Sequence, residues 1–150
     1  MDSKESSAVA LLPIKPKFAD AIMNGTKRVE FRKVKFQRHI RQVIVYASSP
    51  VKMIVGYFDI AGIEEGTPSA LWTKYRAIGG IAENEFREYY RQANNAIAIN
   101  VGEVKHLTTP MRLANLKRNL TAPQSFSYLD VSVMRKLKTE VCKNVTYRRA

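Results

Sequence analysis

A ten-residue stretch at positions 24–33 constrains the fold most, because it joins a helix end directly to a charged strand. Asn24-Gly25 is typical of a helix end, since glycine readily adopts the left-handed conformation that caps a helix. A strand is then expected to begin near Lys27. Charges of both signs are unusual in strands, which favour β-branched and aromatic side chains. This strand therefore carries either a polar site or a solvated face.

Alternation along this strand divides its residues between two faces. Successive strand residues point to opposite faces, so Val29 and Phe31 are expected to face the core. Arg28, Glu30 and Arg32 then line up on the other face. A carboxylate held between two guanidiniums suits recognition of a polar ligand. The same arrangement would also serve as a solvent-exposed face with paired charges.

Positive charge gathers in two blocks of this +12 chain. Residues 27–41 hold seven Lys or Arg and one acid, and residues 105–150 hold ten Lys or Arg and two acids. The segment between them, 42–104, has a net charge of −2. If the two blocks meet in space, they form an electropositive surface whose simplest partner is nucleic acid. A basic surface of this kind could instead contact an acidic protein.

Several classes of protein are disfavoured. No apolar run approaches the roughly 20 residues of a membrane span, so no membrane partner is expected. The polar residues 1–7 do not form a signal peptide, and the one cysteine cannot form an internal disulfide, so we expect a cytoplasmic protein. His39 and His106 lack neighbouring ligand residues. We therefore expect no metal site, and we expect no cofactor.

The hydrophobic pattern predicts an α+β fold with a small sheet that can curl into a barrel. We expect a flexible N-terminal tail over residues 1–10, one domain over 11–141 and a basic C-terminal tail over 142–150. The expected elements are strand 11–14, helix 16–23, strand 27–33, strand 43–47, strand 53–60, helix 68–79, helix 82–93, strand 96–101 and helix 131–141. Gly56, inside a predicted strand, marks a bulge or a close approach of another backbone.

The signature strand also resembles a known family. Residues 12–16 together with 25–32 are similar to the G-x-K-x-x-E-x-R signature of ASCH domains, which belong to the PUA-like superfamily. Residues 46–50 and 123–129 also resemble segments of that family, so the resemblance runs from about 11 to 130. It implies a five- to six-stranded β-barrel with helices at its ends. It also implies a cleft over the signature strand that is suited to RNA or a nucleobase.

The resemblance implies more than one function. ASCH domains are proposed as RNA-binding modules, so RNA is favoured over DNA as the partner. Some small members resemble amidohydrolases that use a Lys, a Thr and a Glu to deacylate a modified cytidine. The Lys matches Lys27, but the Thr position falls on Glu30, which removes the hydroxyl nucleophile. Other members resemble ribonucleases.

Seven residues are candidate nucleic-acid contacts: Lys15, Lys27, Glu30, Arg32, Tyr46, Ser48 and Ser49. Arg32 suits bidentate contact with phosphate or guanine, and Tyr46 ends a strand where it could stack on a base. Ser48 and Ser49 form either a phosphate-binding turn or an ordinary Ser-Pro turn. Lys15 precedes a helix start, where anions are favoured.

Lys27 and Glu30 would be the catalytic pair if the protein is an enzyme. A buried lysine has a lowered pKa and can act as a base, and Glu30 could act as a general acid or base. Simple alternation places Lys27 and Glu30 on opposite faces, so a shared site requires a bulge or twist.

Three hypotheses follow. The first is an RNA-binding module with its cleft over Lys27, Glu30 and Arg32. The second is a hydrolase, a ribonuclease or amidohydrolase-like enzyme, that acts on RNA or a modified nucleoside. The third is a regulatory protein-interaction domain.

Overall fold

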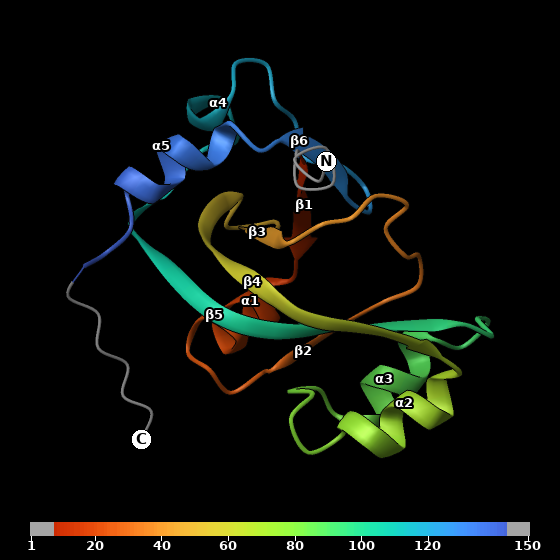
Figure 1. Ribbon diagram of the computed structural model, residues 1–150. Helices are drawn as coiled ribbons and strands as arrows, with labels where there is room; N and C mark the ends of the chain where they lie inside the picture. Colours follow the sequence, from red (N-terminus) through yellow and green to blue (C-terminus); the bar gives the residue numbers. More distant parts are fainter. Residues whose placement is uncertain (1–7, 144–150) are drawn as a thin grey trace.

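A computed structural model describes residues 8–143, which form one mixed six-stranded sheet with helices packed on it (Figure 1). The strand order is β2-β5-β4-β3-β1-β6, and β1 and β3 are the parallel pair. The elements are β1 (Ala8–Ile14), α1 (Pro16–Met23), β2 (Val29–Arg32), β3 (Gln42–Ala47), β4 (Met53–Gly66), α2 (Pro68–Tyr75), α3 (Glu83–Tyr89), β5 (Ala96–Met111), α4 (Leu113–Leu116), β6 (Ser127–Asp130) and α5 (Val133–Thr139).

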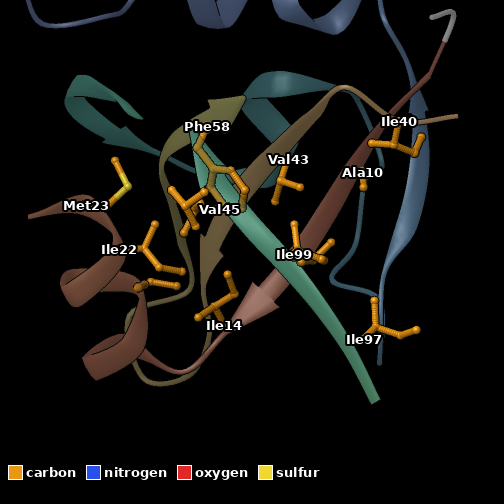
Figure 2. Packing of buried hydrophobic residues seen from close by; sticks show 14 of the residues in the cluster. Ala10, Ile14, Ile22, Met23, Ile40, Val43, Val45, Phe58, Ile97 and Ile99 are labelled. Carbon is orange, nitrogen blue, oxygen red and sulfur yellow. The ribbon is translucent and has the colours of Figure 1, made fainter. Parts of the chain in front are cut away.

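The largest hydrophobic cluster lies on the concave side of the sheet, where α1 covers one end (Figure 2). Alternate residues of β1 and β3 contribute to it, and Ile22 of α1 packs against Val45 and Phe58 from the sheet. The other alternate residues of β1 and β3 are also buried, on the opposite face. Strands covered on both faces are continuous apolar runs rather than alternating ones, which explains the sequences of β1 and β3.

Two smaller clusters cover the outer face. α4 and α5 pack over β1, β3 and β6 through residues such as Leu11, Leu129 and Leu137. α2 and α3 pack over β2 and β5, where the Phe86 ring lies 4.9 Å from that of Phe31. Figure 1 shows these two helix pairs on separate parts of the sheet. Both faces of the sheet are therefore occupied, and β2 is buried between two clusters.

The predicted closed barrel is wrong: among residues 8–143 the sheet remains open, with β2 and β6 as its edges. Each edge strand has only four residues. This is too short for β2 and β6 to pair with each other and close the sheet. Side chains bridge the two edges instead. Phe36, which follows β2, packs its ring 5.0 Å from Phe126 and 6.4 Å from Tyr128 at β6.

Some boundaries differ from the prediction. β1 begins at Ala8, and residues 8–10, which we assigned to the tail, are buried in the sheet because they pair with β6. β6 itself was missed, since four residues that begin with Ser and end with Asp look like a loop. β5 continues ten residues beyond the predicted strand, to Met111. Most of the predicted C-terminal tail, residues 144–150, lies outside the described part.

Within residues 8–143, no helix has the length and apolar character needed to cross a membrane.

Gly56 illustrates how closely the sheet packs. A Cβ at this position would collide with the Met23 methyl group and the Lys105 carbonyl oxygen, which confirms the predicted close approach.

We expect Gly56→Ala to lower the free energy of unfolding by roughly 1–3 kcal/mol, because the core must shift to relieve the overlap. Gly62→Ala is the matched control, since the nearest atom to a Cβ there is Asn100 Nδ2 at 3.5 Å. Equal urea midpoints for the two variants would contradict this account.

Candidate functional site

The turn between α1 and β2 directs Lys27 inward. Gly25 has a positive φ of 88°, and the next two backbone amides, of Thr26 and Lys27, both donate to the Ala21 carbonyl at 3.0 Å. The chain thus folds back against α1 before the strand starts. β2 begins only at Val29, so strand alternation does not apply to Lys27.

Lys27 is a buried cation with one close acceptor. Its side chain is 2% exposed, and Nζ donates to the Gly79 carbonyl at 2.6 Å. Glu30 Oε1 lies 4.0 Å from Nζ, and the Phe18 and Phe31 ring centroids lie 4.9 and 5.2 Å away. Burial lowers the pKa of Lys27, because the desolvation cost of the ammonium outweighs the attraction of the Glu30 carboxylate.

Glu30 lies between Lys27 and Arg32. Its Oε2 accepts from Arg32 Nη1 at 3.0 Å, and its side chain is 8% exposed. The predicted partner Arg28 is exposed and donates instead to the Val101 carbonyl at 3.1 Å. The expectation of a carboxylate between two guanidiniums is therefore wrong. The carboxylate lies between an ammonium and a guanidinium, and we call these three residues (Lys27, Glu30 and Arg32) the buried cluster.

The face that carries Glu30 and Arg32 is not a solvated face. In the β2–β5 register Glu30 pairs with Ile99 and Arg32 with Ile97, and both isoleucines belong to the main core. Val29 and Phe31 face the smaller cluster under α2 and α3. Both faces of β2 are buried, so the charges on one of them must satisfy each other or bind backbone groups.

Arg32 joins one edge of the sheet to the other. Its Nη1 donates to the Pro13 carbonyl of β1 at 3.3 Å, and Nη2 donates to the Ser125 carbonyl, just before β6, at 2.7 Å. The Tyr90 hydroxyl in turn donates to the Arg32 carbonyl at 2.7 Å. Burial raises the pKa of Tyr90, so this hydroxyl remains a donor. Arg32 thereby supplies hydrogen bonds across the gap that the backbone ladder leaves open.

The other predicted contacts form a second group. Tyr46 is 6% exposed and lies on the opposite face of the sheet from the buried cluster, among residues such as Ile44. The Ser48 amide donates to the Ile14 carbonyl at 2.9 Å. Lys15 follows Ile14 directly and is exposed at the start of α1. Lys15, Ser48 and Ser49 thus lie where β1 and β3 end, close to Tyr46.

Two residues that we did not predict adjoin this group. The Ser127 hydroxyl is buried and has no hydrogen-bond partner among the described residues, a costly state for a polar group. Lys52, in the turn after Ser49, has a positive φ of 56°, which is uncommon for lysine. Ser127 lies within a segment that we had matched to the family, so it could have been found. Nothing in the sequence indicates the backbone conformation of Lys52.

Tyr46 and Ser127 lie on the same face on either side of β1, and we call this pair the hydroxyl face. Tyr46 pairs with Pro13 and Ser127 with Leu11. These partners are two residues apart on one face of the strand, about 7 Å along it. Arg32 holds the Pro13 carbonyl and the Ser125 carbonyl, so the buried cluster fixes the backbone next to both hydroxyl groups.

A small pocket adjoins Lys27 at the place where a cleft over the signature strand was expected. Its volume is about 260 Å³, and its lining includes Phe18, which contacts Lys27, and Gly80. Lys17 and Glu85 also line it and form an ion pair of 2.9 Å between α1 and α3. This volume is slightly below the usual range of ligand pockets. Among residues 8–143, no cluster of three or more His, Cys, Asp or Glu side chains could hold a metal ion.

Comparison with known proteins identifies similar sequences and structures. Residues 12–109 match the ASCH domain. The chain is 30% identical over 132 residues to an ASCH domain-containing ribonuclease of Zymomonas mobilis, and the match covers 85% of this chain and 88% of that protein. The crystal structure of ASCH from Zymomonas mobilis superposes with a TM-score of 0.79 at 27% identity, over 89% of this chain and 95% of that one. Variants of that protein with serine replaced by alanine, or tyrosine by phenylalanine, have been solved and superpose equally well.

The lowered pKa of Lys27 predicts a pH dependence of stability. Between its folded pKa and the ordinary value of 10.5, the unfolded chain holds a proton that the folded chain has released. Raising the pH through this window therefore disfavours unfolding. We expect the stability of wild type relative to Lys27→Met to rise in urea titrations as the pH is raised toward 10.5.

Lys17→Met is the control for this series, because the Lys17 side chain is 62% exposed. Its stability difference from wild type should show no such rise. A wild-type advantage over Lys27→Met that shrinks as the pH rises would mean that attraction to Glu30 outweighs the desolvation of Lys27.

Proposed function

The chain belongs to the ASCH domain family, and on that basis we propose that it binds RNA and cleaves it as a ribonuclease. The observation that carries this proposal is the similarity to the Zymomonas ribonuclease, which extends over 85% of this chain and 88% of that protein. A match over nearly the full length of both proteins favours a shared activity more than a match to one segment would. Our hydrolase hypothesis therefore takes precedence over a module that only binds RNA.

The hydroxyl face is the proposed place of cleavage. RNA can be cleaved when the 2′-oxygen attacks the adjacent phosphorus: the 2′-hydroxyl loses a proton, the bond from phosphorus to the 5′-oxygen breaks, and that oxygen gains a proton. Negative charge builds on the phosphate oxygens as the new bond forms. Hydroxyl donors aimed at those oxygens stabilise that charge. Tyr46 and Ser127 provide two such donors on one face.

Cationic side chains surround this place. Lys15 and Lys52 are both exposed near Tyr46, and they would attract the phosphate chain without regard to sequence. Ser48 and Ser49 lie in the turn between Tyr46 and Lys52, where they would contact the same strand. The proposed substrate is therefore a flexible single strand that can follow this turn.

The buried cluster takes a positioning role in this proposal. Lys27 Nζ already donates to the Gly79 carbonyl and the Glu30 carboxylate is already bound to Arg32, whereas the Ser127 hydroxyl has no partner among the described residues. This argues against Lys27 and Glu30 as the acid–base pair. It argues equally against deacylation of a nucleoside at this cluster. We propose that Glu30 and Arg32 hold the strands that present Tyr46 and Ser127.

The test is cleavage of a labelled single-stranded RNA by purified variants. Tyr46→Phe and Ser127→Ala should each lower the cleavage rate by about 10²-fold or more, the usual effect of removing one donor to a developing oxyanion. The controls make the same chemical changes elsewhere: Tyr89→Phe on α3, and Ser125→Ala, two residues before Ser127 with its side chain exposed. Both controls should retain the wild-type rate.

The outcomes separate our hypotheses. If all four variants cleave RNA at the same rate, the hydroxyl face is not the place of catalysis. If wild type binds RNA tightly but does not cleave it, the hypothesis of an RNA-binding module is correct instead. If wild type neither binds nor cleaves RNA, the regulatory protein-interaction domain is the hypothesis that remains.

A further inference from the structure

The segment 104–129 contains no acidic residue, although it includes α4 and the loop that leads to β6. Its three exposed cations are Arg112, Lys117 and Arg118, and we call these residues the α4 surface. None of the three side chains forms an ion pair or a hydrogen bond with another residue of the described part, 8–143. The fourth cation of the segment, Lys105, is paired with Glu103 at 2.9 Å. The charge of the α4 surface is therefore available to a partner from outside the protein.

The α4 surface begins close to Tyr46. Tyr46 pairs with Ile54 of β4, and Ile54 pairs with Met111 of β5, so these three residues lie side by side across the sheet. All three belong to the hydrophobic cluster on the side of the hydroxyl face. Two strand spacings separate Tyr46 from Met111, and Arg112 is the next residue of the chain, so the Cα atoms of Tyr46 and Arg112 are within about 14 Å of each other.

The route from the turn after Tyr46 to the α4 surface passes exposed residues at one end of the sheet. β4 begins at Met53, directly after the exposed Lys52. β5 ends at Met111, directly before the exposed Arg112. Because Ile54 and Met111 are paired, Lys52 and Arg112 leave the same end of the β4–β5 ladder, on the order of 10 Å apart. A phosphate chain can follow these two cations without crossing the buried interior.

Backbone contacts hold the α4 surface in place. Arg112 is extended, with φ −74° and ψ 151°, and its carbonyl accepts from the Asn115 amide at 3.0 Å. Beyond α4, the Leu120 amide donates to the Lys117 carbonyl at 3.1 Å and closes a turn in which Asn119 has a positive φ of 64°. Leu120 packs on the hydrophobic cluster below this turn. Because the turn is already fixed, ligand binding need not order it, which lowers the entropic cost of binding.

The composition of this segment favours nucleic acid over an acidic protein as the partner. Protein–protein interfaces usually bury an apolar centre. None of the large apolar side chains that are exposed in residues 8–143 belongs to the segment 104–129. Its exposed residues include Asn115, Asn119 and Thr121, which are polar and uncharged. Cations among uncharged hydrogen-bonding side chains suit a phosphate chain, which such side chains contact in most nucleic-acid complexes.

We propose that the α4 surface binds phosphates of the RNA strand beyond the nucleotides that Lys15 and Lys52 attract. This inference rests on the proposed function, because it requires RNA to reach the turn after Tyr46. One strand of a duplex advances about 3.4 Å per nucleotide, so roughly four nucleotides at that spacing span the distance from Tyr46 to Arg112. The α4 surface adds affinity for longer strands and takes no part in the bond changes at the cleaved phosphate.

The experiment compares two double variants that each remove two exposed arginine charges. Arg112→Ala/Arg118→Ala changes the α4 surface, and α4 loses no side-chain cap, because Arg112 makes no capping hydrogen bond. The control is Arg76→Ala/Arg91→Ala, beside α2 and α3, which Figure 1 shows on a separate part of the sheet. Anisotropy is measured across a salt series with a single-stranded 2′-O-methyl RNA of roughly 12 nucleotides, which lacks the attacking hydroxyl. Cleavage kinetics are measured with unmodified RNA of the same sequence.

The variant of the α4 surface should lose two phosphate contacts. Each contact contributes about 0.7 to the log–log salt slope of a single strand, so the slope should fall by about 1.4. With binding lines that meet at 1 M salt, the affinity at 0.1 M salt is then lower by roughly 25-fold. KM should rise while kcat is unchanged, because these contacts are the same in the ground state and the transition state. The control should keep the wild-type slope, and Arg112→Lys/Arg118→Lys, which keeps both charges, should restore it.

Two results would overturn the inference in distinguishable ways. If wild type binds and cleaves RNA but the variant of the α4 surface has the same slope as the Arg76/Arg91 control, this surface is not an RNA site and the proposed function stands. If wild type neither binds nor cleaves RNA, both proposals fall. If binding depends on the α4 surface but no cleavage occurs, the inference is supported and the ribonuclease is refuted.

Discussion

The ion pair between Glu30 and Arg32 is the interaction on which the rest of this structure depends. β2 is an edge strand buried on both faces, so a charge on it must find a partner inside the protein. Arg32 meets that requirement with one carboxylate and two backbone carbonyls. These contacts also link the two sides of the open sheet, because Pro13 is in β1, the neighbour of the edge strand β6, and Ser125 lies just before β6. One guanidinium thus does what a longer β2–β6 ladder would do in a closed barrel.

This arrangement separates the signature residues from the hydroxyl face, where we propose that RNA is cleaved. Lys27, Glu30 and Arg32 lie on the side of the main core, whereas Tyr46 and Ser127 lie on the opposite face of the sheet, where Tyr46 is 6% exposed and the Ser127 hydroxyl is buried. The link between them is the backbone that Arg32 holds. A motif that resembles a recognition site can therefore be the support of a different site.

Much of the fold could be predicted from the sequence, and the errors arose where long-range contacts decide the structure. Apolar runs and the Asn24-Gly25 helix end located the central strands and α1, and the family signature was recognised from residues 25–32. Strand alternation assigned Val29 and Phe31 to one face of β2 correctly, but it could not show that the other face, with Glu30 and Arg32, is also buried. It also misplaced Lys27, which precedes the strand, and Arg28, which binds the Val101 carbonyl. The strand β6 depends on pairing with the distant β1, which no local pattern encodes.

A double-mutant cycle on Glu30 and Arg32 tests the central claim most directly. The free energies of unfolding of Glu30→Gln, Arg32→Met and the double variant give the coupling between the two side chains. We predict a coupling of roughly 1–3 kcal/mol, as expected for neighbours in a buried network. The exposed pair Glu83 and Arg87 on α3 is the reference, with a coupling of at most about 0.5 kcal/mol. A Glu30–Arg32 coupling no larger than that reference would contradict the account.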